Sequence, residues 1–301
     1  MTTATQDLVR DRRRSHLLTI FWGMLPAIVG LAMFQYGPLL IALRNGFYDL
    51  ALLNPERAKF VGLANYVKMT KDPLFWQSLR NTAVYSGGKV LLEVPFALLL
   101  ALLSQRAIKG IGILRTAVFS PTVTAMSTIS VIWNMMYHPQ NGLFNSILSG
   151  VGIAPQPFTT SPSQAMASIL MMSVWKDVGT SMLILLSGLQ AIPQEFYEAA
   201  SIDGAGPWEQ ARHITLPLLR RTLLYATVLV TVFSFKVFTP IYVMTKGGPV
   251  GMTRTTVYYV YEVGFQYMQM GYASAISVVL MAIMVIVAVL QNRLLRTEFE
   301  Y

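Results

Sequence analysis

The sequence predicts an all-α polytopic membrane protein with six transmembrane helices. Residues are 54% hydrophobic and only 12% charged, whereas soluble domains average roughly 25% charged residues. The mean hydropathy is +0.50. Six separate apolar runs approach or exceed the ~20 residues that a helix needs to cross a bilayer. Because backbone groups in lipid must be hydrogen-bonded within their own segment, such runs are expected to be helices.

The first three predicted spans cover residues 17–43, 82–103 and 116–137. The first and third contain no charged residue, whereas the second contains Lys89 and Glu93. These two residues are spaced i, i+4, which places them on one helix face and favours an intrahelical ion pair. We therefore interpret them as structural.

The last three predicted spans cover residues 165–189, 216–245 and 265–290. The fourth contains Lys176 and Asp177, and the fifth contains Lys236 well inside its range. Charges within membrane spans are costly and commonly mark a functional pathway. These three residues are therefore candidates for a polar cavity.

The distribution of Lys and Arg predicts that both termini are cytoplasmic. With that orientation the inner segments hold more Lys and Arg than the outer loops, as the positive-inside rule requires. The outer loop 138–164 contains no charged residue, and the short inner loop 104–115 contains three basic residues and no acid. Residues 44–81 are too polar for a span, and we expect them to form a small folded cap outside.

A polar segment, residues 193–206, separates the fourth and fifth spans. Pro193 suits a helix first turn, and Glu195 is favoured there by the helix dipole. Ala199 and Ala200 leave room for close approach to another surface, and Gly204 is suited to ending a helix. The sequence therefore predicts a short helix that lies outside the membrane and docks onto a partner.

The order of residues in and after this helix matches a longer pattern, EAA-x3-G-x9-I-x-LP. It is formed by Glu198-Ala199-Ala200, Gly204 and Ile214-Thr215-Leu216-Pro217. The pattern resembles the signature of the membrane subunits of binding-protein-dependent ABC importers. In that family it forms the cytoplasmic coupling helix, which fits a cleft in the ATPase. The resemblance implies that coupling involves five residues: Glu198, Ala199, Ala200, Asp203 and Gly204.

Further stretches resemble the sugar and glycerol-phosphate branch of that family. They include FVGLANY at 60–66, DPLFW at 72–76, TKGGP at 245–249 and GYASA at 271–275. The resemblance implies one half of a translocation path for a sugar or related polyol in the bacterial cytoplasmic membrane. It also implies a second permease subunit, two ATPase subunits and an extracytoplasmic binding protein that delivers substrate.

The same resemblance assigns a substrate path to parts of the fourth and fifth spans. The candidate residues are Trp175, Lys176, Asp177, Thr180, Ser234 and Lys236. Aromatic faces with charged groups are the chemistry that a sugar site needs, so we predict that all six face one polar cavity. Two alternatives stay open: Lys176 and Asp177 form a structural pair, or Lys236 extends to the outer interface.

Several function classes are disfavoured by missing residues and motifs. The sequence has no Cys and three His, and it lacks the GxxxxGK[ST] phosphate-binding loop. We therefore expect neither an enzyme nor a bound metal or cofactor, with ATP and Mg²⁺ held by the partner ATPases. The basic residues flank apolar runs, which argues against nucleic acid. An alternative is an ion-coupled secondary transporter that uses Lys176, Asp177 and Glu93 as a relay.

Overall fold

The computed structural model of the chain describes residues 21–105 and 110–295. Among these residues, five helices are long and apolar enough to cross a membrane, or six if one sharply bent pair counts as a single span. The predicted all-α polytopic fold is confirmed.

The first half of the chain contains a long helix, a small hairpin and five further α-helices. The first span is the helix Phe21–Asn45, which includes the π-turn η1 (Ala32–Tyr36) and α2 (Gly37–Asn45). The elements that follow are β1 (Tyr48–Asp49), η2 (Pro55–Arg57), β2 (Lys59–Phe60), α3 (Ala64–Thr70), α4 (Pro73–Gln105), α5 (Ile111–Val123), α6 (Met126–Met136) and α7 (Leu143–Gly150). β1 and β2 pair antiparallel, with Tyr48 opposite Phe60.

The second half contains three long helices joined by short ones. Its elements are η3 (Phe158–Thr160), α8 (Ala165–Gln190), α9 (Gln194–Ile202), α10 (Pro207–Gln210), η4 (Ala211–Thr215), α11 (Leu216–Phe235), η5 (Ile241–Thr245), α12 (Thr256–Tyr261), η6 (Glu262–Gln266) and α13 (Met270–Leu295). α10, η4 and α11 form one continuous helix.

α8 is the central helix of the bundle, and it packs against α4, α5 and α11. Its side chains Met182, Leu185 and Leu189 are fully buried. At Gly179 a Cβ atom would lie 2.5 Å from the carbonyl oxygen of Val118 on α5. A glycine is therefore required for these helices to approach so closely, as is common between helices that pack in a membrane.

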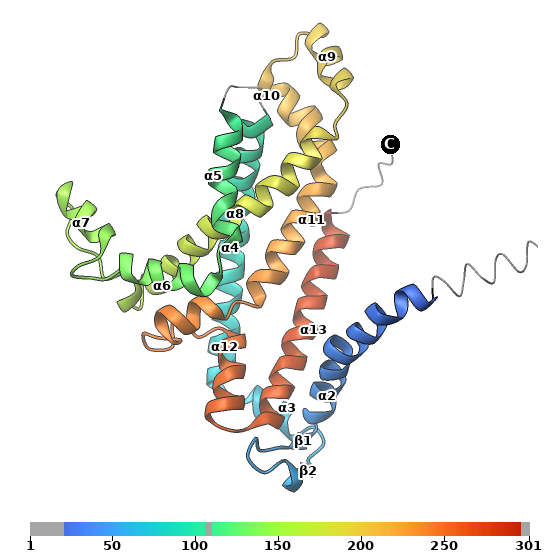
Figure 1. The fold of residues 1–301 in the computed structure, drawn as a ribbon, viewed down its shortest axis with the longest axis vertical. Helices are drawn as coiled ribbons and strands as arrows, with labels where there is room; N and C mark the ends of the chain where they lie inside the picture. The colour runs from blue at the N-terminus through green and yellow to red at the C-terminus, as the bar shows by residue number, and fades with distance from the viewer. Residues whose placement is uncertain (1–20, 106–109, 296–301) are drawn as a thin grey trace, which may run out of the picture.

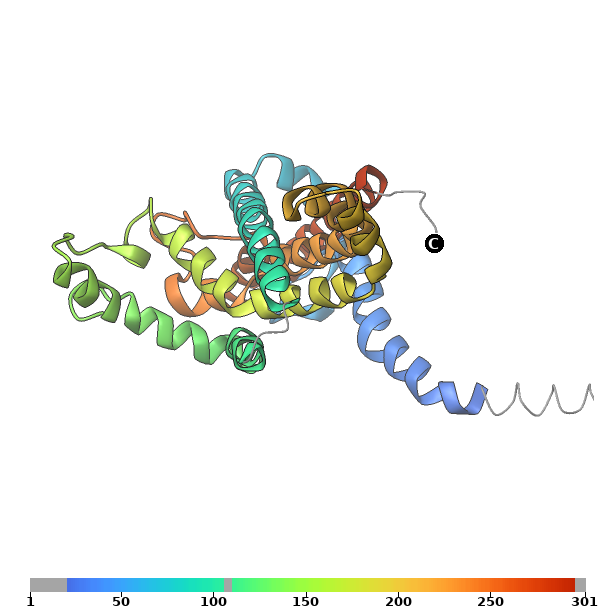
Figure 2. The ribbon, with the colours of Figure 1, turned by 90° about the horizontal axis from the view of Figure 1, so that it is seen from above.

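Two parts of the chain extend away from this bundle. Seen from above, α6 and α7 extend on one side and the N-terminal helix on another (Figure 2). No residue in the most apolar window of that N-terminal helix is buried. The short helix α9 lies at one end of the molecule, and the β1–β2 hairpin lies at the opposite end (Figure 1).

The third predicted span, 116–137, is wrong as a single straight helix. Its residues belong to α5 and α6, which meet at an angle of 101°. The break follows Pro121, which lacks a backbone N–H and disrupts the helical ladder. Thr124 then adopts an extended conformation, with ψ near 142°.

The fifth predicted span, 216–245, ends too late and begins too late. The helix stops at Phe235. After an interruption at residues 236–238, a new helical segment begins at Thr239, with Pro240 in its first turn. At its other end the helix continues back to Pro207. The helical turn before Pro217 widens into the π-helix η4, a feature that accommodates breaks in the helical ladder.

The remaining ranges differ from the helices mainly at their ends. The second span, 82–103, lies within α4, which begins at Pro73, so the cap predicted for residues 44–81 is shorter than expected. The sixth, 265–290, is shifted, because the helix begins at Met270. Residues 17–20 of the first span lie outside the described residues.

A carboxylate joins the N-terminal end of α4 to α12 and α13. Asp72 accepts hydrogen bonds from the hydroxyls of Tyr259 at 2.5 Å and Tyr272 at 2.6 Å, and from the backbone N–H of Leu74 at 2.9 Å. Partial burial raises the pKa of the Asp72 carboxyl, but these hydrogen bonds outweigh burial and lower the pKa below its ordinary value.

We expect Asp72→Asn to destabilise the protein by about 1 kcal/mol at pH 7, because charge-assisted hydrogen bonds become neutral ones. A lowered pKa in the folded state stabilises the protein above the unfolded value near ~4, and this contribution is lost as pH falls through the folded pKa. Thermal unfolding measured between pH 7 and pH 3 should show that the difference in stability between Asp72→Asn and wild type becomes smaller as the pH falls. Asp49→Asn, at an exposed position, is the control. Equal effects of both variants would contradict the prediction.

Candidate functional site

A cavity of about 400 Å³ lies between α4, α8 and α11. α4 contributes Tyr85 to its wall, α6 contributes Met126, and the segment after the end of α11 contributes residues 236–240. Its charged wall residues are Lys89, Glu93, Asp177 and Lys236. The break between α5 and α6 and the end of α11 therefore both meet this cavity.

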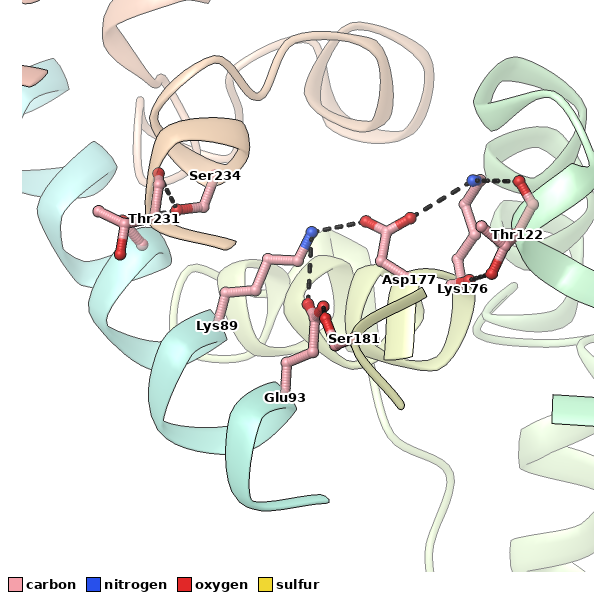
Figure 3. A network of polar contacts seen from close by, with 9 residues as sticks. Lys89, Glu93, Thr122, Lys176, Asp177, Ser181, Thr231 and Ser234 are labelled. Atoms are coloured by element: carbon pink, nitrogen blue, oxygen red, sulfur yellow. Dashed lines mark hydrogen bonds and ion pairs between the residues drawn. The ribbon is translucent and has the colours of Figure 1, made fainter. Parts of the chain in front are cut away.

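Lys89 on α4 is the centre of a buried ion network (Figure 3). Its Nζ lies 2.6 Å from Oδ2 of Asp177 on α8 and 3.6 Å from Oε2 of Glu93. The other oxygen of Glu93 accepts a hydrogen bond of 2.6 Å from Ser181. Because Asp177 and Ser181 lie on α8, the network joins α4 to α8.

The network extends from Asp177 to α5 through Lys176. The Nζ of Lys176 lies 3.4 Å from Oδ1 of Asp177 and donates to the carbonyl of Thr122 at 3.3 Å. The hydroxyl of Thr122 donates in turn to the backbone carbonyl of Lys176 at 3.0 Å. This reciprocal pair holds α8 against α5 immediately before the bend into α6.

The network contains two ammonium groups and two carboxylates, so its formal charge is zero. Lys89 and Glu93 are almost fully buried, whereas the Asp177 side chain is 27% exposed. Burying an isolated charge costs several kcal/mol, and removing one partner from a buried pair is strongly destabilising. The network therefore allows a polar wall to exist inside an apolar bundle.

Three of the six residues predicted to face a shared cavity do so. Asp177, Thr180 and Lys236 line it. Lys176 is buried against α5 instead. Ser234 is also buried, and its hydroxyl forms a 2.5 Å hydrogen bond with that of Ser86 on α4.

Trp175 faces a different, apolar cavity of about 770 Å³. Its ring packs against Trp133, with ring centroids 5.2 Å apart, and Phe144 and Phe158 also line this cavity. Trp175 precedes Asp177 by two residues, which is a rotation of about 200° on a helix. That rotation explains why one cavity cannot include both side chains, so the prediction of a single shared cavity is wrong for this residue.

Sequence reasoning missed Lys89 and Glu93 as cavity residues. Their i, i+4 spacing indicated an intrahelical pair, and that pair exists at 3.6 Å. The shorter contact of Lys89, however, is to Asp177 on another helix. The signal that could have identified it is the presence of opposite charges in two separate spans.

The polar segment 193–206, which the sequence predicts to dock onto a partner, contains α9. None of the residues of α9 is buried. Glu198 and Ala199 are exposed, and Ile202 is 87% exposed. Tyr197 anchors the helix through a 3.0 Å hydrogen bond between its hydroxyl and that of Thr215. α9 therefore presents acidic and apolar side chains at the end of the bundle, beyond the long helices (Figure 1).

Gly204 ends the turn after α9 with φ = +84°, a conformation that glycine adopts without strain. No atom lies within 4 Å of the position of an added Cβ. Asp203 is the C-cap of α9. Gly206 then begins α10, where its N–H donates to Glu209 at 2.8 Å.

These features define a class of protein: a polytopic α-helical membrane protein with a polar cavity and an exposed helix outside the bundle. Comparison with known proteins is more specific. The sequence profile described as "Binding-protein-dependent transport system inner membrane component" matches residues 93–297. The chain belongs to this family.

Similar proteins include several transport permeases. The trehalose/maltose transport system permease protein MalF of Thermococcus litoralis is 40% identical over 74% of this chain and 75% of its own length. The probable ABC transporter permease protein YurN of Bacillus subtilis is 32% identical over 92% and 96%. The sulfoquinovosyl glycerol permease SmoG of Agrobacterium fabrum is 32% identical over 91% and 89%.

A chain in the solved structure of a bacterial ABC transporter for the acidic polysaccharide alginate has the same fold. Its TM-score is 0.84 at 24% identity, with 98% of this chain and 100% of that chain covered. Together with family membership, this confirms the predicted permease of an ABC importer, a multi-pass inner-membrane component. The chain is therefore not an enzyme, because ATP hydrolysis belongs to separate subunits. The family also decides against the ion-coupled alternative.

We expect Lys89→Met to destabilise the protein by about 3 kcal/mol. Glu93 would lose the ammonium it contacts, and Asp177 would lose the nearer of its two lysines. The double variant Lys89→Met/Glu93→Gln should recover part of this loss, since Lys176 and Asp177 remain paired. Thermal unfolding in detergent measures both. Lys236→Gln, at an exposed position, should have little effect on stability. A double variant no more stable than the single would contradict the role of charge balance.

Proposed function

We propose that this chain forms one half of the translocation path of an importer for a sugar or related polyol. A second permease subunit completes the path. The names of its relatives support a carbohydrate substrate, since they include permeases for trehalose/maltose, arabinooligosaccharides and sulfoquinovosyl glycerol. The cavity between α4, α8 and α11 is the candidate path.

The chemistry of this cavity supports the assignment. Phe233, Phe238 and Tyr85 bring aromatic rings to its wall, and Asp177, Thr180 and Ser181 bring polar groups. Aromatic and aliphatic faces pack against sugar rings, and a few placed polar groups bind hydroxyls. Trp175, Lys176 and Ser234 then act behind this wall by holding the helices together.

We further propose that α9 is the coupling helix. Glu198, Ala199, Ala200, Asp203 and Gly204 would contact a cleft in one of two ATPase subunits, which hold ATP and Mg²⁺. The observation that supports this proposal most strongly is that the short helix containing Glu198-Ala199-Ala200 extends from the bundle and has no buried residue. Ile202 and Trp208, 87% and 76% exposed, supply the apolar part of such a surface.

This assignment places α9 and both termini in the cytoplasm of a bacterium. The β1–β2 hairpin at the opposite end then lies outside, where a substrate-binding protein would dock. Motion of the ATPases upon binding ATP would move α9 and switch the cavity from inward- to outward-facing. The Lys and Arg distribution supports the same orientation.

The coupling proposal predicts that Gly204→Trp uncouples ATP hydrolysis from uptake or blocks ATPase assembly, because the bulky ring would occupy the docking surface. Glu198→Lys should weaken coupling by reversing a charge there. Uptake and ATPase rates of the assembled complex in proteoliposomes are the measurements.

Gly152→Trp is a matched control for backbone strain. Gly152 also has a positive φ, +80°, and no atom within 4 Å of an added Cβ, but it lies in the predicted outer loop. It should cost similar stability without uncoupling transport. Normal coupled transport by the Gly204→Trp and Glu198→Lys variants would refute the proposal.

The orientation can be tested with single cysteines, because the native chain has none. Ser149 and Ser201 are both exposed and lie on α7 and α9. An impermeant maleimide applied to intact spheroplasts should label Ser149→Cys and spare Ser201→Cys until the membrane is opened. The reverse pattern would invert the orientation.

A further inference from the structure

Lys236 differs from the other charged residues of the cavity because it has no carboxylate partner in the part of the chain that the structure describes. Within residues 21–105 and 110–295 it forms no ion pair. Lys236 is exposed, and its Nζ lies 5.1 Å from the ring centroid of Phe233, a cation–π contact that is weak at an exposed site. The residue caps α11 and lines the cavity.

Lys236 also lies inside the bundle rather than at one of its ends. The neighbouring residue Ser234 is hydrogen-bonded to Ser86, which lies near the middle of α4 (Pro73–Gln105). A helix of that length spans about 50 Å. Ser86 lies 13 residues, or about 20 Å, from the nearer end of α4, and Lys236 follows the partner of Ser86 by two residues.

The charge balance of the cavity leaves one ammonium uncompensated. Lys89 and Lys176 are balanced by Glu93 and Asp177, which they contact. Lys236 adds a net positive charge on the α11 side of the cavity. An uncompensated charge within a membrane protein is stable only when water or a counter-charge accompanies it.

We propose that the transported sugar carries an anionic group, such as a carboxylate, sulfonate or phosphate, that binds Lys236 during passage. This inference rests on the proposed function, in which the cavity is part of the path. The opposite wall suits the hydroxyls of the same molecule. Thr180 is exposed and lines the cavity, so its hydroxyl can exchange a hydrogen bond with a sugar hydroxyl.

The geometry gives the two walls separate roles. Asp177 is held by two lysines and does not present a free negative charge that would repel an anion. Phe233 and Phe238 lie beside Lys236 in the lining and offer apolar surface to a sugar ring. A neutral sugar would use these faces and Thr180 but would leave the ammonium of Lys236 without a counter-charge.

Protection of an introduced cysteine tests this inference. Thr180→Cys puts a single thiol on the exposed wall of the cavity. The variant is assembled with its partner permease and ATPases in proteoliposomes, and the rate of maleimide labelling of this chain is measured. The probes are matched pairs at up to 100 mM: maltose with maltobionate, and trehalose with trehalose 6-phosphate. Inorganic phosphate alone is also included.

We expect the anionic member of at least one pair to protect the thiol at a concentration about tenfold lower than the neutral member, as a charge-assisted hydrogen bond predicts. Lys236→Gln should abolish this preference, and Lys236→Arg should retain it. The labelling rate without ligand should be the same in all three, which shows that the cavity is intact.

The outcomes separate this inference from the proposed function. Equal protection by neutral and anionic sugars, or a preference that survives Lys236→Gln, would overturn the charge assignment while leaving the path in place. Protection by inorganic phosphate as strong as that by trehalose 6-phosphate would also overturn it, because the site would then bind any anion. Failure of every sugar to protect the thiol would instead refute the cavity as the path.

Discussion

The contact between Lys89 and Asp177 is the interaction on which the arrangement of the central helices depends. It joins α4 to α8 at 2.6 Å, and Lys176 continues the connection from α8 to α5. In lipid there is little hydrophobic drive to bring helices together, so close packing and polar contacts must fix their positions. A charged network is costly to bury unless each member is paired. The same pairing that makes the network tolerable therefore specifies which helices are neighbours.

The irregular parts of the backbone lie where this network meets the cavity. α5 stops before α6 near Thr122, and α11 stops at Phe235, next to Lys236. Backbone that is not helical cannot face hydrocarbon, because its polar groups would lack partners. Here the residues after the end of α11 line the cavity. Ends of broken helices near the middle of a bundle are a recurring feature of transporter binding sites, which agrees with the proposed path.

The sequence predicted the long helices well and their ends poorly. Apolar length and the cost of charge determine where a helix can cross lipid, so 165–189 agrees closely with α8. Apolar length alone does not reveal the break after Pro121 or the interruption at residues 236–238, which both lie inside apolar runs. The cavity was only partly predicted for a related reason. Asp177 and Thr180 lie on one face of α8, whereas Trp175 lies on another. Residues that are close in the sequence therefore point into different cavities, because each step along a helix rotates the side chain. For Lys89 and Glu93 the sequence offered one signal, opposite charges in two separate spans, and their place in the cavity wall follows from the packing of α4 against α8.

A single rigid element connects the cavity with the proposed coupling helix. α8 runs without interruption from Asp177 to Gln190, about 20 Å at the rise of an α-helix, and only three residues separate it from α9. On the other side of α9, the continuous helix that begins at Pro207 returns to the cavity at Lys236. If α9 moves with the ATPase as proposed, the two helices that flank α9 carry that movement to opposite walls of one cavity.

Because Asp177 holds Lys89 and Lys236 lacks an ionic partner among the described residues, the two walls differ. Displacing the α8 wall strains a buried ion network, whereas the α11 wall is joined to α4 by the neutral hydrogen bond between Ser234 and Ser86. A substrate anion bound to Lys236 would therefore add an attraction between the walls that is absent when the cavity is empty, and this attraction would favour one arrangement of the helices over the other.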